Sequence, residues 1–176
     1  MIPACTRSAC FSLFALLLVF LNSCGNPFNE KLTVNADRET FEKERAAWNS
    51  GDIKNYRFTY EFFNDAGPAG PVKITVRENE APVVENPDQY HEYVMAETMP
   101  QIYDFINGTF DFIETVKNGT YDGLKIVSVT LQISYDGQYH YPREVAFSEG
   151  YAEPVDGGGY YTLKITEFVP LQPNEP

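Results

Sequence analysis

Residues 127–135 read Val-Ser-Val-Thr-Leu-Gln-Ile-Ser-Tyr, so that apolar and polar side chains alternate at every position. Successive side chains of a β-strand point to opposite faces, and the segment therefore presents one apolar and one polar face. An antiparallel sheet that is covered on one side is built from such strands. The stretch predicts a sheet with one face packed on a core.

Other segments repeat this alternation with a period of two. They are residues 54–63, 72–77 and 161–166, with shorter candidates at 82–85 and 143–148. Stretches rich in Asn, Asp and Gly separate them, at residues 64–68, 78–80, 136–138 and 156–159. These residue types are typical of tight turns between antiparallel strands.

Helical periodicity begins before the first strand, at residues 38–48. Either Asn35 or Asp37 can cap this helix, and acidic residues fill its early turns. Phe41 and Trp48 lie on one narrow apolar stripe, while the remaining faces are charged. The helix is expected to lay this stripe on the sheet.

A second helical segment lies between the two groups of strands. Thr98 is a good N-cap, and Pro100 falls in the first turn, where its missing N–H costs little. The apolar stripe consists of Ile102, Phe105, Ile106, Ile113 and Val116. Asn107 and Gly108 interrupt the middle, which leaves a kinked helix and two shorter helices as alternatives.

The order of these segments is α-β-β-β-α-β-β-β. It predicts the α+β class, with one curved antiparallel β-sheet and two helices packed on one face. Residues 37–170 are expected to form a single domain, and residues 171–176 a disordered tail.

The N-terminal region has the pattern of an export signal. Residues 10–21 form an uncharged, mostly apolar run that is too short to span a bilayer comfortably and has the length of a signal-peptide core. The ending Leu21-Asn22-Ser23-Cys24 resembles the lipobox of bacterial lipoproteins. Residues 1–23 are thus expected to be a lipoprotein signal peptide, and residues 24–36 a lipidated N-terminus and tether. An uncleaved anchor helix or an ordinary signal peptide is the alternative.

Lipid on Cys24 would hold the protein at a membrane surface of the bacterial cell envelope, on the periplasmic or the outer side. Gly25 and Asn26 stand where some bacteria use Asp for inner-membrane retention, which slightly favours the outer membrane. The remaining cysteines, Cys5 and Cys10, lie within the signal peptide, so the exported part holds no disulfide.

The formal net charge of −12 argues against nucleic acid as a partner, because phosphate binding needs clustered Lys and Arg. It also argues against electrostatic attraction to anionic lipid. His91 and His140 are the only histidines and have no metal-ligand spacing, so neither a metal nor a cofactor is expected. Residues 147–150 lack the first glycine of a nucleophile elbow, and no catalytic residue is predicted.

A group of tyrosines is the candidate recognition patch. It comprises Tyr135, Asp136, Tyr139, Tyr141 and Tyr160, in or beside loops, where Tyr supplies contact area at low entropic cost. Tyrosine hydroxyls that are simply solvated at the margin of the sheet are the alternative. The leading hypothesis is a non-enzymatic binding or scaffolding module that engages a protein or another envelope component.

Two other roles stay open. A small-ligand carrier would have a deep apolar pocket between sheet and helices, whereas an envelope hydrolase would have a histidine and a carboxylate in a cleft. An exposed tyrosine patch above a filled core would favour the binding module.

Several stretches resemble a family of small bacterial lipoproteins that is known as a domain of unknown function. They are residues 48–61 and 72–79, the helix after Thr98, Ile133-Ser134-Tyr135-Asp136 followed by Tyr139-His140-Tyr141-Pro142, and residues 156–165. A Gly usually precedes the Tyr-Pro pair in this family, and His140 stands there in this chain. The resemblance implies an exported, often lipidated α+β domain, and it implies no reaction, ligand or functional residue.

Overall fold

The computed structural model describes residues 32–85, 97–118, 120–155 and 159–172. The signal peptide, Cys24, the tether as far as residue 31 and the last residues of the tail, 173–176, lie outside the described residues.

Both helices begin at the caps that the sequence offers. Helix α2 spans Arg38–Ser50, and the Asp37 side chain accepts a hydrogen bond from the Thr40 N–H at 2.9 Å. Helix α3 spans Met99–Thr115, and Thr98 and Gln101 form a capping box. It runs without a break through Gly108 and continues into a 3-10 turn, η2, at Val116–Asn118. Of the two alternatives that the sequence left open, the continuous helix excludes two shorter helices.

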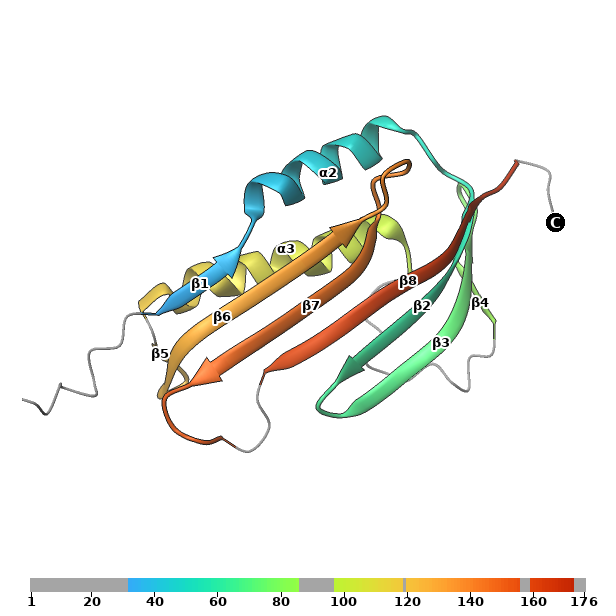
Figure 1. The fold of residues 1–176 in the computed structure, drawn as a ribbon. Helices are drawn as coiled ribbons and strands as arrows, with labels where there is room; N and C mark the ends of the chain where they lie inside the picture. The colour runs from blue at the N-terminus through green and yellow to red at the C-terminus, as the bar shows by residue number, and fades with distance from the viewer. Residues whose placement is uncertain (1–31, 86–96, 119, 156–158, 173–176) are drawn as a thin grey trace, which may run out of the picture. The chain divides into compact units, whose positions relative to one another are not determined.

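The strands follow the predicted alternation, with two additions. They are β1 Thr33–Ala36, β2 Tyr56–Asn64, β3 Gly67–Val76, β4 Val83–Glu85, β5 Thr120–Tyr121, β6 Leu124–Tyr135, β7 Pro142–Tyr151 and β8 Tyr160–Pro170. Across the sheet they are ordered β1-β6-β7-β8-β2-β3-β4, and β5 pairs with β6 outside this path (Figure 1). The α+β class is confirmed.

The expectation of a purely antiparallel sheet is wrong, because β1 pairs with β6 in parallel and Thr33 lies opposite Ser128. The other strand pairs are antiparallel. Strand β1 has four residues, of which three are exposed. It therefore lacks the alternation of buried and exposed side chains from which a strand can be predicted. It lies in the segment that the sequence assigns to the tether and leads through Asp37 directly into α2.

The inward face of β2 is the centre of the core. Tyr56, Phe58, Tyr60 and Phe62 are all buried and alternate with partly exposed residues, as the sequence predicts. Rings from both helices contact this row, since Trp48 of α2 lies 5.6 Å from Tyr56 and Phe105 of α3 lies 6.0 Å from Phe62.

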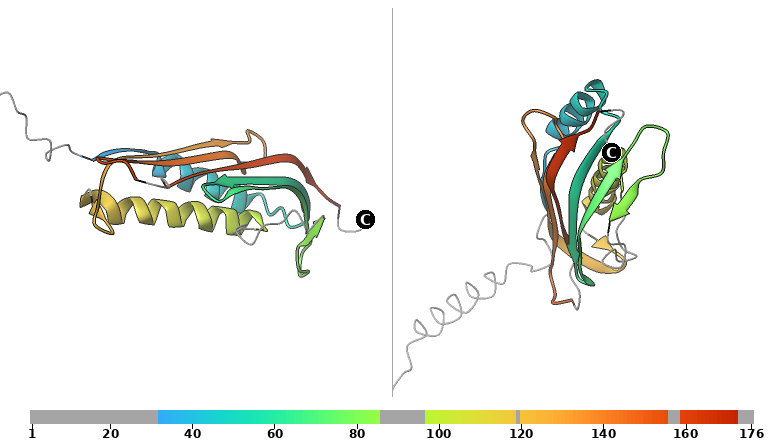
Figure 2. Two further views of the ribbon diagram at one scale, coloured as in Figure 1. Left: turned by 90° about the horizontal axis from the view of Figure 1, so that it is seen from below. Right: turned by 90° about the vertical axis from the view of Figure 1, so that its right-hand side faces the viewer.

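The helices lie along the strands of the sheet. Helix α3 extends along β6, β7 and β8, while β2 and β3 bend toward it at one end (Figures 1 and 2). The two helices are joined by Arg45, which lies 2.5 Å from Asp104, and by Arg38, which donates to Asn107 at 3.0 Å. Each of the two ends of the sheet carries a candidate site.

Candidate functional site

Four of the five predicted patch residues, Tyr135, Asp136, Tyr139 and Tyr141, lie together at the β6–β7 hairpin. The Asp136 carboxylate accepts hydrogen bonds from the backbone N–H groups of Gln138 and Tyr139, at 2.9 and 2.7 Å. Such an Asp closes its own turn. In this structure Asp136 shapes the hairpin.

Tyr139 and Tyr141 pack against the ring of Phe168. Their ring centroids lie 5.4 and 4.5 Å from it, and Tyr141 is only 7 % exposed. Trp48 and Tyr56 also contact the Phe168 ring, with ring centroids at 5.8 and 5.6 Å. These two tyrosines therefore belong to an aromatic cluster that closes this end of the core.

Two of the hairpin residues also face the helices. Tyr135 is half-buried, and its hydroxyl has no hydrogen-bond partner among the described residues. Burial, reinforced by the nearby Glu44 carboxylate, raises the pKa of Tyr135. The Tyr103 hydroxyl of α3 donates to the carbonyl oxygen of His140.

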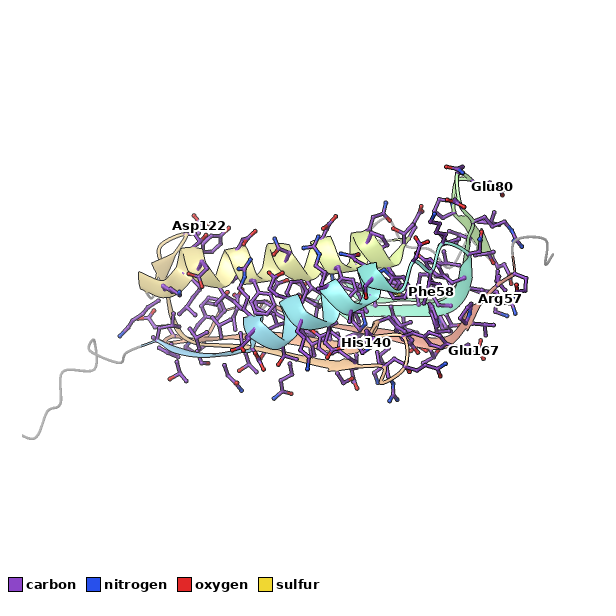
Figure 3. All side chains as sticks on the ribbon, turned by 90° about the horizontal axis from the view of Figure 1, so that it is seen from above. Arg57, Phe58, Glu80, Asp122, His140 and Glu167 are labelled. Atoms are coloured by element: carbon purple, nitrogen blue, oxygen red, sulfur yellow. The ribbon has the colours of Figure 1, made fainter. Side chains whose placement is uncertain are left out.

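His140 has a φ of +63°, in the left-handed region that favours glycine. A glycine would adopt this conformation without the strain that a side chain imposes. The imidazole Nδ1 of His140 (labelled in Figure 3) lies 2.7 Å from the Glu44 Oε2, which links the hairpin to α2. The pair fixes the hairpin against the helix and does not line the pocket described next.

Tyr160, the fifth residue, lies at the opposite end of the sheet, where it begins β8 and pairs with Ser148 of β7. It is 40 % exposed and contacts Phe63 at 5.9 Å between ring centroids. The structure does not bring it near the other four.

A pocket of about 550 Å³ opens at this second end, between α3 and the ends of β2, β7 and β8. Half of its lining residues are aromatic. The lining residues are Phe62, Asn64, Asp65, Phe105, Gly108, Thr109, Phe112, Phe147, Glu149, Gly159, Tyr160 and Tyr161. The volume lies within the range of about 300–1,000 Å³ that is usual for small-molecule sites.

The ring of Tyr161 forms the centre of the lining. Phe62 and Phe147 stack on it at 5.7 and 5.3 Å, and Phe105 of α3 meets it edge-on at 5.0 Å. The Tyr161 hydroxyl lies 2.6 Å from the Thr109 Oγ1 in a buried hydrogen bond. Burial raises the pKa of Tyr161 to about 12, although the bond to Thr109 lowers it. The sheet side of the pocket is thus a fixed aromatic surface.

The helix side of the pocket has a gap at Gly108, between Phe105 and Phe112. A Cβ atom built on Gly108 would meet no atom within 4 Å among the described residues. A glycine inside a helix costs about 1 kcal/mol relative to alanine. Gly108 is exposed, so the helix carries no side chain over this part of the pocket, and the space beside it is open to another molecule.

Two carboxylates mark the rim. Glu149 accepts a hydrogen bond from the Tyr151 hydroxyl, and burial together with this bond raises the pKa of Tyr151 to about 12. The Glu149 N–H donates to the carbonyl oxygen of Gly159 at 2.9 Å. Asp65 reaches the rim from the turn between β2 and β3.

The described residues contain no group of three or more His, Cys, Asp or Glu side chains that could hold a metal ion. None of their helices has both the length and the apolar character that a membrane crossing requires.

Residues 40–168 match the family described as Family of unknown function (DUF6174). The chain belongs to this family. No curated protein matches the chain, and no solved structure does. DUF6174 membership thus covers both helices and nearly the whole sheet, including the hairpin and the pocket, and assigns no activity to either.

Most of the pocket residues are absent from the sequence-based patch. Phe62, Phe105 and Phe147 belong to the apolar stripes, and stripes alone predict core. The usable signal was Gly108, which stands inside the helical stripe between two phenylalanines. A glycine at such a position indicates either a break in the helix or a place where the helix carries no side chain. Because α3 is unbroken, the second interpretation applies.

Proposed function

We propose that the protein is a lipid-anchored binding module of the bacterial cell envelope, without enzymatic activity, that holds a small and largely apolar ligand between α3 and the sheet. Of the roles considered from the sequence, this is the small-ligand carrier. The observation that carries it is the open, aromatic-lined space above Gly108.

The other two roles have less support. Tyr139 and Tyr141, central to the recognition patch, are engaged in the aromatic cluster around Phe168. The nearest arrangement to a hydrolase site is the pair of His140 and Glu44, and neither residue lines the pocket.

The anchor is supported by the uncharged run of residues 10–21, by Cys24 directly after it, and by the resemblance to lipoproteins. Two or more acyl chains hold a protein firmly at a bilayer, at about 0.8 kcal/mol per buried methylene. Mass spectrometry of the native product should find lipid on Cys24 and no residues before it. Release of wild-type protein from membranes by salt alone would contradict the anchor.

Filling the gap tests the pocket. Gly108→Leu places a branched side chain in the open space and keeps a strong helix former in α3, so folding is expected to survive. The matched control, Gly108→Ala, adds only a methyl group. The full chain, with 15N-labelled phenylalanine, is titrated with phenylbutanol while the amide resonances of Phe105 and Phe112 are followed.

We expect Gly108→Leu to weaken phenylbutanol binding at least tenfold and Gly108→Ala to stay within twofold of wild type. The alanine variant should also unfold at higher urea, because it removes a helical glycine. If the leucine variant binds as well as wild type, or if phenylbutanol shifts neither resonance, the pocket is not a binding site.

A further inference from the structure

Resting on the proposed function, we propose that the ligand carries a cationic group on its apolar body, and that Glu149 recognises this group at the rim of the pocket. The ligand class is a small amine with an aromatic or aliphatic tail.

The charges around the pocket have one sign. Asp65 and Glu149 are the charged side chains among its lining residues, and Lys and Arg do not occur among them. Neither carboxylate forms an ion pair within the described part of the chain, whereas Glu144 on the same strand as Glu149 lies 3.6 Å from Lys164. A bound cation would therefore meet two carboxylates in a lining that contains no lysine or arginine.

The rings supply the second feature. The negative face of an aromatic ring attracts an ammonium group within about 6 Å, and several rings around one site form the cages that recognise quaternary amines. The pocket is lined by Phe62, Phe105, Phe112, Phe147, Tyr160 and Tyr161. An anionic ligand would be repelled by the two carboxylates and would find no lysine or arginine in the lining, so the rings and the carboxylates both favour a cation.

Contacts with neighbouring residues hold the Glu149 carboxylate at the rim of the pocket. The Tyr151 hydroxyl donates to one carboxylate oxygen, and the carboxylate lies against the backbone of Gly159. A Cβ on residue 159 would sit 2.6 Å from the Glu149 Cδ and Oε2, closer than atoms can approach. Glycine at this position lets the carboxylate remain at the rim, and its removal offers a way to displace the charge without deleting it.

The test compares three probes of one shape: phenylbutylamine, phenylbutanol and phenylbutyrate. Each is titrated into the full chain with the phenylalanine amide readout, and each variant is compared with wild type for the same probe. Glu149→Gln keeps the size and the acceptor oxygen but removes the charge. Glu80→Gln makes the same change of net charge in the exposed turn after β3 (labelled in Figure 3), which does not line the pocket, and is the control.

For wild type we expect the amine to bind most tightly and the butyrate most weakly. Glu149→Gln should weaken amine binding about five- to tenfold and leave phenylbutanol within twofold. Gly159→Ala should weaken the amine at least twofold by moving the carboxylate. Glu80→Gln should leave both probes within twofold, and added salt should reduce the preference for the amine.

The outcomes separate the two proposals. If phenylbutanol binds and the amine gains nothing over it, or if Glu149→Gln leaves the amine affinity unchanged, the cationic ligand is excluded and the apolar pocket stands. An equal loss in Glu80→Gln and Glu149→Gln would show an effect of net charge alone, which also overturns the assignment to Glu149. If none of the three probes shifts Phe105 or Phe112, the proposed function itself fails.

Discussion

Replacing Tyr161 by Phe should change how the stability of the protein depends on alkaline pH. The Tyr161 side chain is 9 % exposed, and its hydroxyl is hydrogen-bonded to Thr109 at 2.6 Å. The substitution keeps the stacked ring and removes only the hydroxyl. At pH 8 it should cost about 1 kcal/mol, because a buried hydrogen bond is lost.

The magnitude at higher pH follows from the pKa. Burial raises the pKa of Tyr161 from 10.0 to about 12 in the folded protein. The folded state therefore holds this proton more tightly than the unfolded state, and the resulting stability is complete below pH 10 and lost as the pH rises through 12. At 1.36 kcal/mol per pKa unit, the loss is about 1.4 kcal/mol at pH 11 and about 2.3 kcal/mol at pH 12. Tyr161→Phe does not incur this loss.

Urea unfolding at intervals from pH 8 to pH 11.5 measures the difference. The free energies of unfolding of wild type and Tyr161→Phe should converge near pH 11 and cross above it. Tyr160→Phe removes the same group from the neighbouring, exposed residue and should give a curve parallel to wild type. Parallel curves for wild type and Tyr161→Phe would refute the claim that burial holds this hydroxyl protonated.

Three further predictions concern stability. Thr98→Ala removes the capping box of α3 and should lower the free energy of unfolding by about 1 kcal/mol in urea, and an unchanged midpoint would contradict this role. Gly70→Ala should cost more than about 2 kcal/mol, because φ is +94° and the new Cβ would lie 2.6 Å from the Tyr60 carbonyl oxygen; a neutral result would refute this. His140→Gly relieves a left-handed φ worth about 1 kcal/mol but loses the contact with Glu44, so its net effect should be within about 1 kcal/mol. In a double-mutant cycle that combines His140→Gly with Glu44→Gln, the coupling free energy should be about 0.5–1 kcal/mol. Additive effects on the free energy of unfolding would show that the contact between His140 and Glu44 does not stabilise the protein.

The strands and helix starts could be predicted because each depends on its own segment. Burial of one face gives the side chains of β2 and β6 a period of two. The first N–H groups of α3 have no partner within the helix, so the sequence needs a hydrogen-bond acceptor such as Thr98 at its start. Strand β1 could not be found in this way. Its four residues bury little, and its partner in β6 lies far along the chain, so only the assembled sheet defines it.

The tyrosine patch shows where composition misleads. Tyr141 lies just before β7, and Tyr160 begins the antiparallel strand β8, so the two lie near opposite ends of the sheet. Tyr160 pairs with Ser148, which is seven residues from Tyr141, and at about 3.4 Å per residue the separation is about 24 Å. Two consecutive antiparallel strands, as the sequence predicts them, already imply that their starting residues lie at opposite ends. The pocket was harder to predict from the sequence, because the space above Gly108 forms only when α3 and three strands come together.

The two ends of the sheet differ in how they are held, and this difference supports the placement of the ligand. At the hairpin, directional contacts fix the helices, through Glu44 with His140 and through the Tyr56 hydroxyl, which accepts the Met99 N–H at 2.9 Å. At the pocket, α3 meets the sheet through the edge of the Phe105 ring and through the buried hydrogen bond between Thr109 and Tyr161, while Gly108 between these two residues contributes no side chain. A ligand can therefore occupy the space beside Gly108 without displacing a contact that holds α3 to the sheet.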